Sequence, residues 1–117
     1  MQLTEISFTH ATPIDGYGPG FFRVGGQVIE GAICVTEASA VKWEGFANAA
    51  PLLALKGQVD VIFIGTGAEI AHIPASLRAE LEAAGIGVEI MNSPAACRTY
   101  NVLLSEGRRV AVAALPV

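Results

Sequence analysis

The sequence has few charged residues, few aromatic residues and only two cysteines. Charged residues make up 15% of the 117 positions and aromatic residues 7%, whereas 52% are hydrophobic. This balance excludes an intrinsically disordered chain, which combines low hydrophobicity with high charge. The length predicts a single domain over residues 1–117, large enough to build a core without disulfides or metals.

Positive charge is scarce and is not clustered. Seven Lys and Arg residues stand against 11 Asp and Glu residues, and the only adjacent basic pair is Arg108 and Arg109. Proteins that bind the phosphate backbone carry basic patches. The formal net charge of −4 therefore argues against nucleic-acid binding.

The two cysteines and the missing targeting signals predict a compartment. Cys34 and Cys97 lie in apolar or helical contexts and do not form a secreted disulfide framework, so we expect reduced thiols. No apolar run approaches the roughly 20 residues that span a bilayer. Residues 1–10 lack the basic stretch and apolar run of a signal peptide. We expect a cytoplasmic protein without a transmembrane segment, which leaves peripheral docking on a membrane protein open.

The first third of the chain predicts a β-meander. Gly25-Gly26 supplies the positive φ angles of a tight hairpin turn, and the Gly- and Pro-rich stretch before it predicts a loop. Apolar residues at helical spacing predict one helix, although Pro51 falls late within it. The expected elements are an edge strand at 3–8, a loop at 11–20, strands at 21–24, 27–35 and 41–43, and a helix at 44–55.

The second half alternates between strands and helices. Such alternation favours a parallel βαβαβ arrangement with right-handed crossovers. Ser93 is predicted as the N-cap and Pro94 as the first residue of the last helix. The expected strands are 59–64, 87–91 and 110–115, and the expected helices are 74–84 and 93–106. An open edge of this sheet would allow a homodimer.

Gly65-Thr66-Gly67 follows the most hydrophobic strand. Open α/β sheets place ligand sites at such strand ends, where glycine lets backbone N–H groups approach an anion. The segment matches neither G-x-G-x-x-G nor the Walker pattern. A tight structural turn and a ligand-facing surface both remain open. Gly65→Val should destabilise or distort the turn if the φ angle of Gly65 is positive.

The stretch from Met91 to Asn101 holds the other candidate residues. Cys97 is either a thiol activated near a helix N-terminus or a small buried residue. Arg98 and Asn101 share a helix face, and Arg98 needs an anionic partner, either Glu89, Asp15 or an external anion. Tyr100 is expected in the core with its hydroxyl bonded.

Known catalytic and metal-binding patterns do not occur. His10 and His72 have no ligand residues at zinc spacing, and there is no G-x-S-x-G motif or paired-carboxylate motif. Glu106 is a candidate ion-pair partner for Arg108 or Arg109, worth little if exposed. We therefore expect no cofactor, no metal and no enzymatic activity.

Several segments together resemble a known family. They are Gly65-Thr-Gly67 after a hydrophobic strand, Gly85-Ile-Gly-Val-Glu-Ile-Met91, Ala95-Ala-Cys-Arg-Thr-Tyr-Asn-Val-Leu103 and Glu106-Gly-Arg-Arg-Val110. The sequence resembles the domain of unknown function 498 family, which includes mitochondrial respiratory complex I assembly factor 3. The resemblance implies a single α/β domain with three layers, β/β/α, and no established catalytic activity. It also implies partners among respiratory-complex subunits or assembly proteins.

Two functional hypotheses follow. In the first, the chain is a non-enzymatic binding protein that assists complex I assembly, and the residues that form or support its partner surface are Gly65, Thr66, Gly67, Cys97, Arg98, Tyr100 and Asn101. In the second, it binds a small molecule or anion where the Gly-Thr-Gly turn meets the Ser93 helix, with or without minor catalytic activity. That site would use Arg98 as the charged group.

Overall fold

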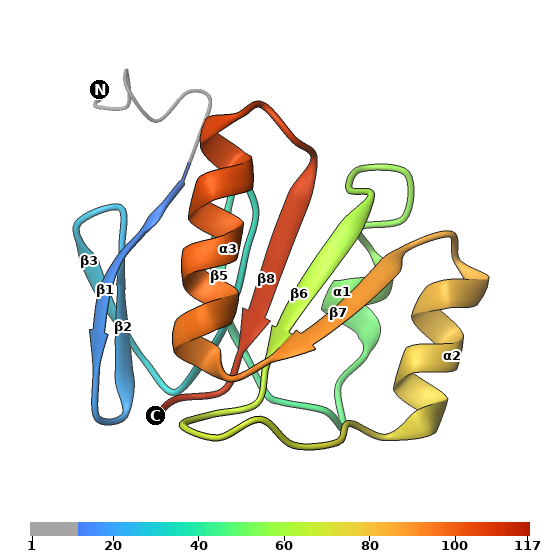
Figure 1. Cartoon of the computed structure of the whole chain (residues 1–117), viewed down its shortest axis with the longest axis horizontal. Coiled ribbons are helices and arrows are strands. Elements are labelled where there is room, and N and C mark those ends of the chain that lie inside the picture. The colour runs from blue at the N-terminus through green and yellow to red at the C-terminus, as the bar shows by residue number, and fades with distance from the viewer. Residues whose placement is uncertain (1–11) are drawn as a thin grey trace.

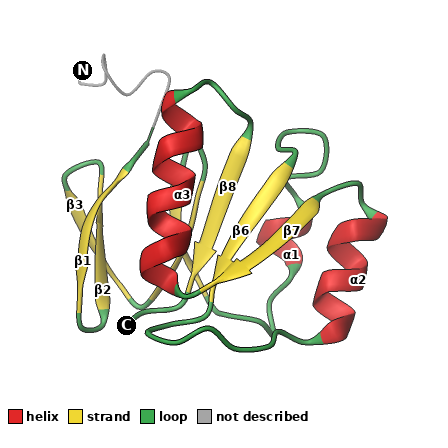
Figure 2. Ribbon diagram, viewed as in Figure 1, coloured by secondary structure: helices red, strands yellow, loops and turns green. Residues whose placement is uncertain are grey.

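The computed structural model describes residues 12–117, so the edge strand expected at 3–8 lies outside the described residues. Two sheets and three helices form a mixed α/β fold (Figures 1 and 2), as expected. The strands are β1 Ile14–Gly18, β2 Phe21–Val24, β3 Gln27–Glu30, β4 Ala32–Val35, β5 Ala40–Trp43, β6 Val61–Gly65, β7 Gly87–Met91 and β8 Val110–Ala114. The helices are α1 Ala50–Leu53, α2 Ala75–Ala83 and α3 Ser93–Ser105.

The larger sheet has the strand order β5-β4-β8-β6-β7. β6 pairs in parallel with β7 and β8, whereas β4 pairs antiparallel with β5 and β8. The parallel part is the βαβαβ unit that the alternation of the second half predicts. β8 lies in the middle, and all five of its residues are buried.

Alternation of side chains along β8 separates two cores. Val110, Val112 and Ala114 pack on the side of α3, whereas Ala111 and Ala113 pack on the side of α1 and α2. This period of two is the geometry of a strand that is covered on both faces. α3 and the small sheet β1-β2-β3 cover one face, and α1 and α2 cover the other.

The loop expected at 11–20 is wrong for its central part, because β1 pairs antiparallel with β2. The glycines of β1 do not turn the chain, since neither Gly16 nor Gly18 has a positive φ. Gly18 instead makes room for the ring of Phe21, which a Cβ at that position would strike. Glycine here permits a close approach rather than a bend.

The hairpin over Gly25-Gly26 is confirmed, with φ values of 56° and 83° at the two glycines. Its second arm is shorter than expected. Gly31, with φ 87°, separates β3 from β4, and β4 joins the larger sheet.

The helix expected at 44–55 is also wrong in its extent, because α1 covers only Ala50–Leu53. Gly45 has a φ of 95°, which a helix cannot contain, and Pro51 lies in the first turn of α1. Proline lacks a backbone N–H, so it is tolerated in the first turn of a helix but disrupts the interior. Proline therefore begins this helix instead of interrupting it.

Candidate functional site

The Gly65–Gly67 turn connects the ends of three strands. The N–H of Leu115 donates to the carbonyl of Gly65 at 2.9 Å, just beyond β8. The N–H of Thr66 donates to the carbonyl of Met91 at 3.0 Å, at the end of β7. The turn therefore ties β6 to both of its neighbours at the point where α3 begins.

Ser93 completes this connection from the first turn of α3. Its side chain is fully buried, and its hydroxyl accepts the N–H of Gly67 at 2.9 Å while it donates to the carbonyl of Leu115 at 2.6 Å. The predicted roles of Ser93 as the N-cap and of Pro94 as the first helical residue are wrong, because α3 begins at Ser93 itself. Asn92 is the cap, because its Oδ1 accepts the N–H of Ala95 at 2.8 Å.

The internal bonds of this turn bear on the anion-binding hypothesis. The backbone N–H groups of Thr66 and Gly67 both donate to acceptors of the protein itself. The hydroxyl of Thr66 donates to the carbonyl of Glu69 at 2.7 Å and accepts the N–H of Ala71 at 3.0 Å. The donors that an anion would need already have partners, so the arrangement does not favour that hypothesis.

The condition of a positive φ at Gly65 is not met, since Gly67, with φ 101°, is the residue of this turn in that region. Gly65 is required for a different reason. A Cβ at position 65 would lie 2.7 Å from the Cα of Ser93. The turn thus needs one glycine for its backbone angle and another for close packing.

Two candidate side chains of α3, Cys97 and Tyr100, are buried. Burial raises the pKa of the Cys97 thiol to about 12, so the thiol stays protonated at neutral pH. A protonated, buried thiol is a poor nucleophile. Burial also raises the pKa of Tyr100, whose hydroxyl donates to the carbonyl of Thr12 at 2.8 Å, as expected for a core tyrosine.

Asn101 connects α3 to the start of β1. Its Oδ1 accepts the N–H of Ile14 at 2.9 Å, and its Nδ2 donates to the carbonyl of Ile14 at 2.8 Å. A single side-chain amide therefore bonds to both backbone groups that a neighbouring strand would use. The residues Tyr100 and Asn101 together fix α3 against the small sheet.

Arg98 is exposed on α3, beside a groove of 270 Å³ between α3 and β1. The groove is lined by Ile14, Asp15, Gly16, Tyr17, Pro94, Cys97, Arg98, Asn101 and Val102. Within residues 12–117, Arg98 makes no ion pair, and so neither Glu89 nor Asp15 serves as the expected internal partner. The Asp15 carboxylate instead accepts the N–H of Gly26 at 2.8 Å.

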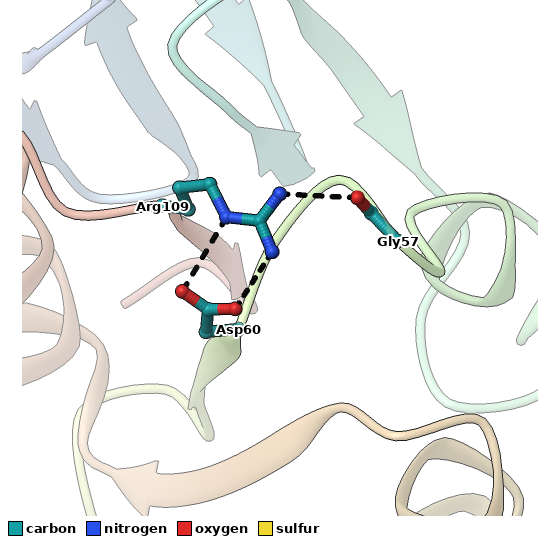
Figure 3. Close-up of polar contacts among 3 residues, drawn as sticks. All are labelled: Gly57, Asp60 and Arg109. Carbon is teal, nitrogen blue, oxygen red and sulfur yellow. Dashed lines mark hydrogen bonds and ion pairs between the residues drawn. The ribbon is translucent and has the colours of Figure 1, made fainter.

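Arg109 forms an ion pair that sequence reasoning missed. Its guanidinium donates to Asp60 with Nη2 at 2.8 Å and Nε at 3.4 Å, and to the carbonyl of Gly57 at 3.1 Å (Figure 3). Glu106 is the candidate partner from the sequence, because the pairing with Asp60 spans 49 positions and leaves no local signal. The bonded Arg109 guanidinium lowers the pKa of Asp60.

Other parts of the described chain add no chemical centre. No group of three or more His, Cys, Asp or Glu side chains lies close enough to hold a metal ion among residues 12–117. The longest helix in that range, α3, has 13 residues, and none there could cross a bilayer. The features that remain are the Gly65–Gly67 turn and the groove between α3 and β1.

Sequence relatives share most of this chain. It is 53% identical, over 100% of its length and 94% of the relative's, to an uncharacterised protein of Rhodobacter capsulatus. It is 31% identical to a Danio rerio protein named NADH dehydrogenase [ubiquinone] 1 alpha subcomplex assembly factor 3, over 99% of this chain and 71% of that protein.

Solved structures share the fold of this chain, and one family model matches most of its sequence. A crystal structure from Bartonella henselae, described as an outer membrane protein, superposes with a TM-score of 0.81 at 33% identity, over 90% of this chain and 94% of that one. A Bordetella parapertussis protein superposes with a TM-score of 0.80 at 33% identity, over 93% and 98% of the two chains. The model of the proteins of unknown function DUF498/DUF598 matches residues 14–115, and this chain belongs to that family.

Proposed function

We propose that this protein is a non-enzymatic binding protein that assists the assembly of respiratory complex I. The Danio rerio relative, named as an assembly factor for NADH dehydrogenase, aligns with 99% of this chain and supports the proposal. Proteins of one fold can differ in function, so the site must also agree with this role. The compartment proposed for it is the cytoplasm, with docking at the membrane surface.

The observation that carries the proposal is the contrast between the two features of the site. Polar groups of the Gly65–Gly67 turn are bonded within the protein, whereas Arg98 is exposed beside a groove. Tyr17 and Val102, which line the same groove, are 47% and 50% exposed. Surfaces that contact another protein combine exposed apolar side chains with polar groups at their rim.

In this proposal the predicted residues divide into two roles. Arg98 contacts the partner, and Cys97 lines the groove from its buried side. The other predicted residues support the surface from within, namely Gly65, Thr66, Gly67, Tyr100 and Asn101. Their bonds hold α3 against both sheets, which keeps the groove in one shape.

The test is deletion of the gene in its own organism, followed by return of the wild-type gene or a variant. We expect deletion to lower NADH:quinone activity in isolated membranes and the amount of complex I on native gels. The wild-type gene should restore both. Unchanged activity and unchanged complex I after deletion would contradict the proposal.

A matched pair of arginine variants locates the partner surface. Arg98→Ala should fail to restore complex I, whereas Arg78→Ala should restore it. Arg78 is also a helical arginine, with 42% of its side chain exposed, but it lies on α2 and pairs with Glu82 at 3.2 Å. Equal restoration by both variants would place the partner surface elsewhere.

A further inference from the structure

The hydrogen-bonding directions in the small sheet follow from its hairpin. Gly25 and Gly26 both have positive φ, so the turn is the two-residue type I′ turn, which Val24 and Gln27 close as a hydrogen-bonded pair. Bonding alternates along an antiparallel ladder, so the backbone groups of Arg23 point to β1. Gly16, opposite Arg23, is then bonded to β2.

The same alternation leaves the backbone of Tyr17 facing away from β2. Tyr17 lies opposite Phe22, whose own backbone groups bond to β3. Ile14 confirms the direction of this edge, since its N–H and carbonyl bond to Asn101 of α3. At Tyr17 no described residue takes the place that Asn101 takes at Ile14.

The groove beside this edge combines apolar surface with one positive charge. Tyr17 and Val102 expose about half of their surface, from opposite walls of the groove. Arg98 is the only basic residue among those that line it. Asp15 also lines it, but its carboxylate already accepts the N–H of Gly26. An arginine fork binds carboxylates with paired hydrogen bonds, so the groove complements an acidic and apolar segment.

We propose that an extended, acidic segment of a partner protein binds along β1, with its backbone bonded to Tyr17 and a carboxylate on Arg98. Addition of a strand to a sheet edge is a general mode of peptide recognition, in which backbone bonds provide affinity and alternate side chains provide specificity. The inference deepens the proposed function, on which it rests for the existence of a protein partner.

The probe is a short peptide with blocked ends that alternates glutamate and valine. It is titrated into the full isotope-labelled chain and followed by NMR. We expect saturable shifts of the amide signals of Tyr17, Arg98 and Val102. A matched peptide with lysine in place of glutamate should bind about tenfold more weakly or not at all, because it loses a charge-assisted bond.

Two proline variants test the backbone bonds. Tyr17→Pro removes the outward N–H of β1 without removing a bond to β2, and it should abolish the peptide shifts. Val28→Pro is the matched control. Val28 is 52% exposed on β3 at the opposite edge of the small sheet, and its N–H also points outward, so this variant should bind normally. Arg98→Gln changes an exposed helical position without an ion pair among the described residues, so we expect it to fold normally and to weaken binding about tenfold.

The outcomes separate this inference from the proposed function. Equal binding of the two peptides, or shifts centred on Val28, would overturn it. Contacts in the free chain between residues 1–11 and Tyr17 or Val102 would also overturn it, because the occupant would be the protein's own segment. The proposed function fails separately, when gene deletion leaves complex I unchanged.

Discussion

At the scale of single residues, Gly65 and Ser93 depend on each other. The Cα of Ser93 lies 2.7 Å from the position that a Cβ at Gly65 would take, and the hydroxyl of Ser93 bonds to both Gly67 and Leu115. Gly65 leaves room for the backbone of Ser93, and the Ser93 hydroxyl makes the hydrogen bonds that join the strand ends. The turn is therefore a packed junction of strand ends, and its glycines serve the fold.

Gly65→Ala should destabilise the protein by about 1–3 kcal/mol, because the added Cβ meets backbone atoms of α3 that cannot move independently. Gly16→Ala is the control. Gly16 is also a strand glycine without positive φ, and nothing lies within 4 Å of its Cβ position. Urea unfolding measures both variants. Equal urea midpoints for the two variants would contradict this prediction, because α3 would then shift to accommodate the added Cβ without a loss of stability.

Ser93→Ala should cost about 1–3 kcal/mol, since it leaves the buried N–H of Gly67 and the carbonyl of Leu115 without partners. Ser105→Ala serves for comparison. Ser105 also donates to a carbonyl, that of Val102 at 2.7 Å, but it is exposed, and water can replace the bond. If Ser93→Ala and Ser105→Ala unfold at similar denaturant midpoints, the hydrogen bonds of Ser93 do not stabilise the protein as we expect.

At the scale of elements, the Asp60–Arg109 ion pair joins the connection before β6 to the start of β8. We expect the Asp60 carboxyl to titrate below its ordinary pKa, and Arg109→Gln to return it towards that value. The folded state then binds fewer protons than the unfolded state, so the stability from this pair is present above the unfolded pKa and is lost as the pH falls through the acid range.

NMR titration of the Asp60 side chain measures this shift directly. Arg108→Gln is the control, because it removes a neighbouring charge but none of the hydrogen bonds to Asp60. The two variants should differ clearly, with the larger change for Arg109→Gln. If the pKa of Asp60 is unchanged in Arg109→Gln, the ion pair does not persist in solution.

Two elements, β1 and α1, differ from what their glycine and proline residues predict. Glycine and proline predict loops, yet β1 contains two glycines, and α1 begins with a proline in its first turn. The homodimer expected at an open sheet edge remains a prediction, and both β5 and β7 are edge strands of the larger sheet. The outer edge of β1 differs from these because α3 lies beside it.

At the scale of the whole molecule, β8 organises the fold. It is paired on both sides and covered on both faces. Its amides should exchange with solvent most slowly, through opening that approaches global unfolding. The outward-facing amides of the edge strands β1, β3, β5 and β7 should exchange faster, because each of these strands pairs with only one neighbour. Hydrogen exchange measures both, and similar rates would contradict this hierarchy.

The sequence by itself determined the elements of the second half and one hairpin in the first. The apolar runs of β6 and β8, the glycines after α2 and α3, and the Gly25-Gly26 hairpin are local patterns whose physical causes act within a few residues. The mixed α/β class follows from the same patterns.

Only the tertiary structure decided the site. Ser93 reads as a cap until Gly67 and Leu115 are placed beside it, and Asp60 and Arg109 meet only because β6 and β8 are neighbours. Arg98 shows an exposed face only once α3 has packed on β6 and β8. These outcomes depend on contacts between distant residues, which the packing of the sheet creates and which no local pattern encodes.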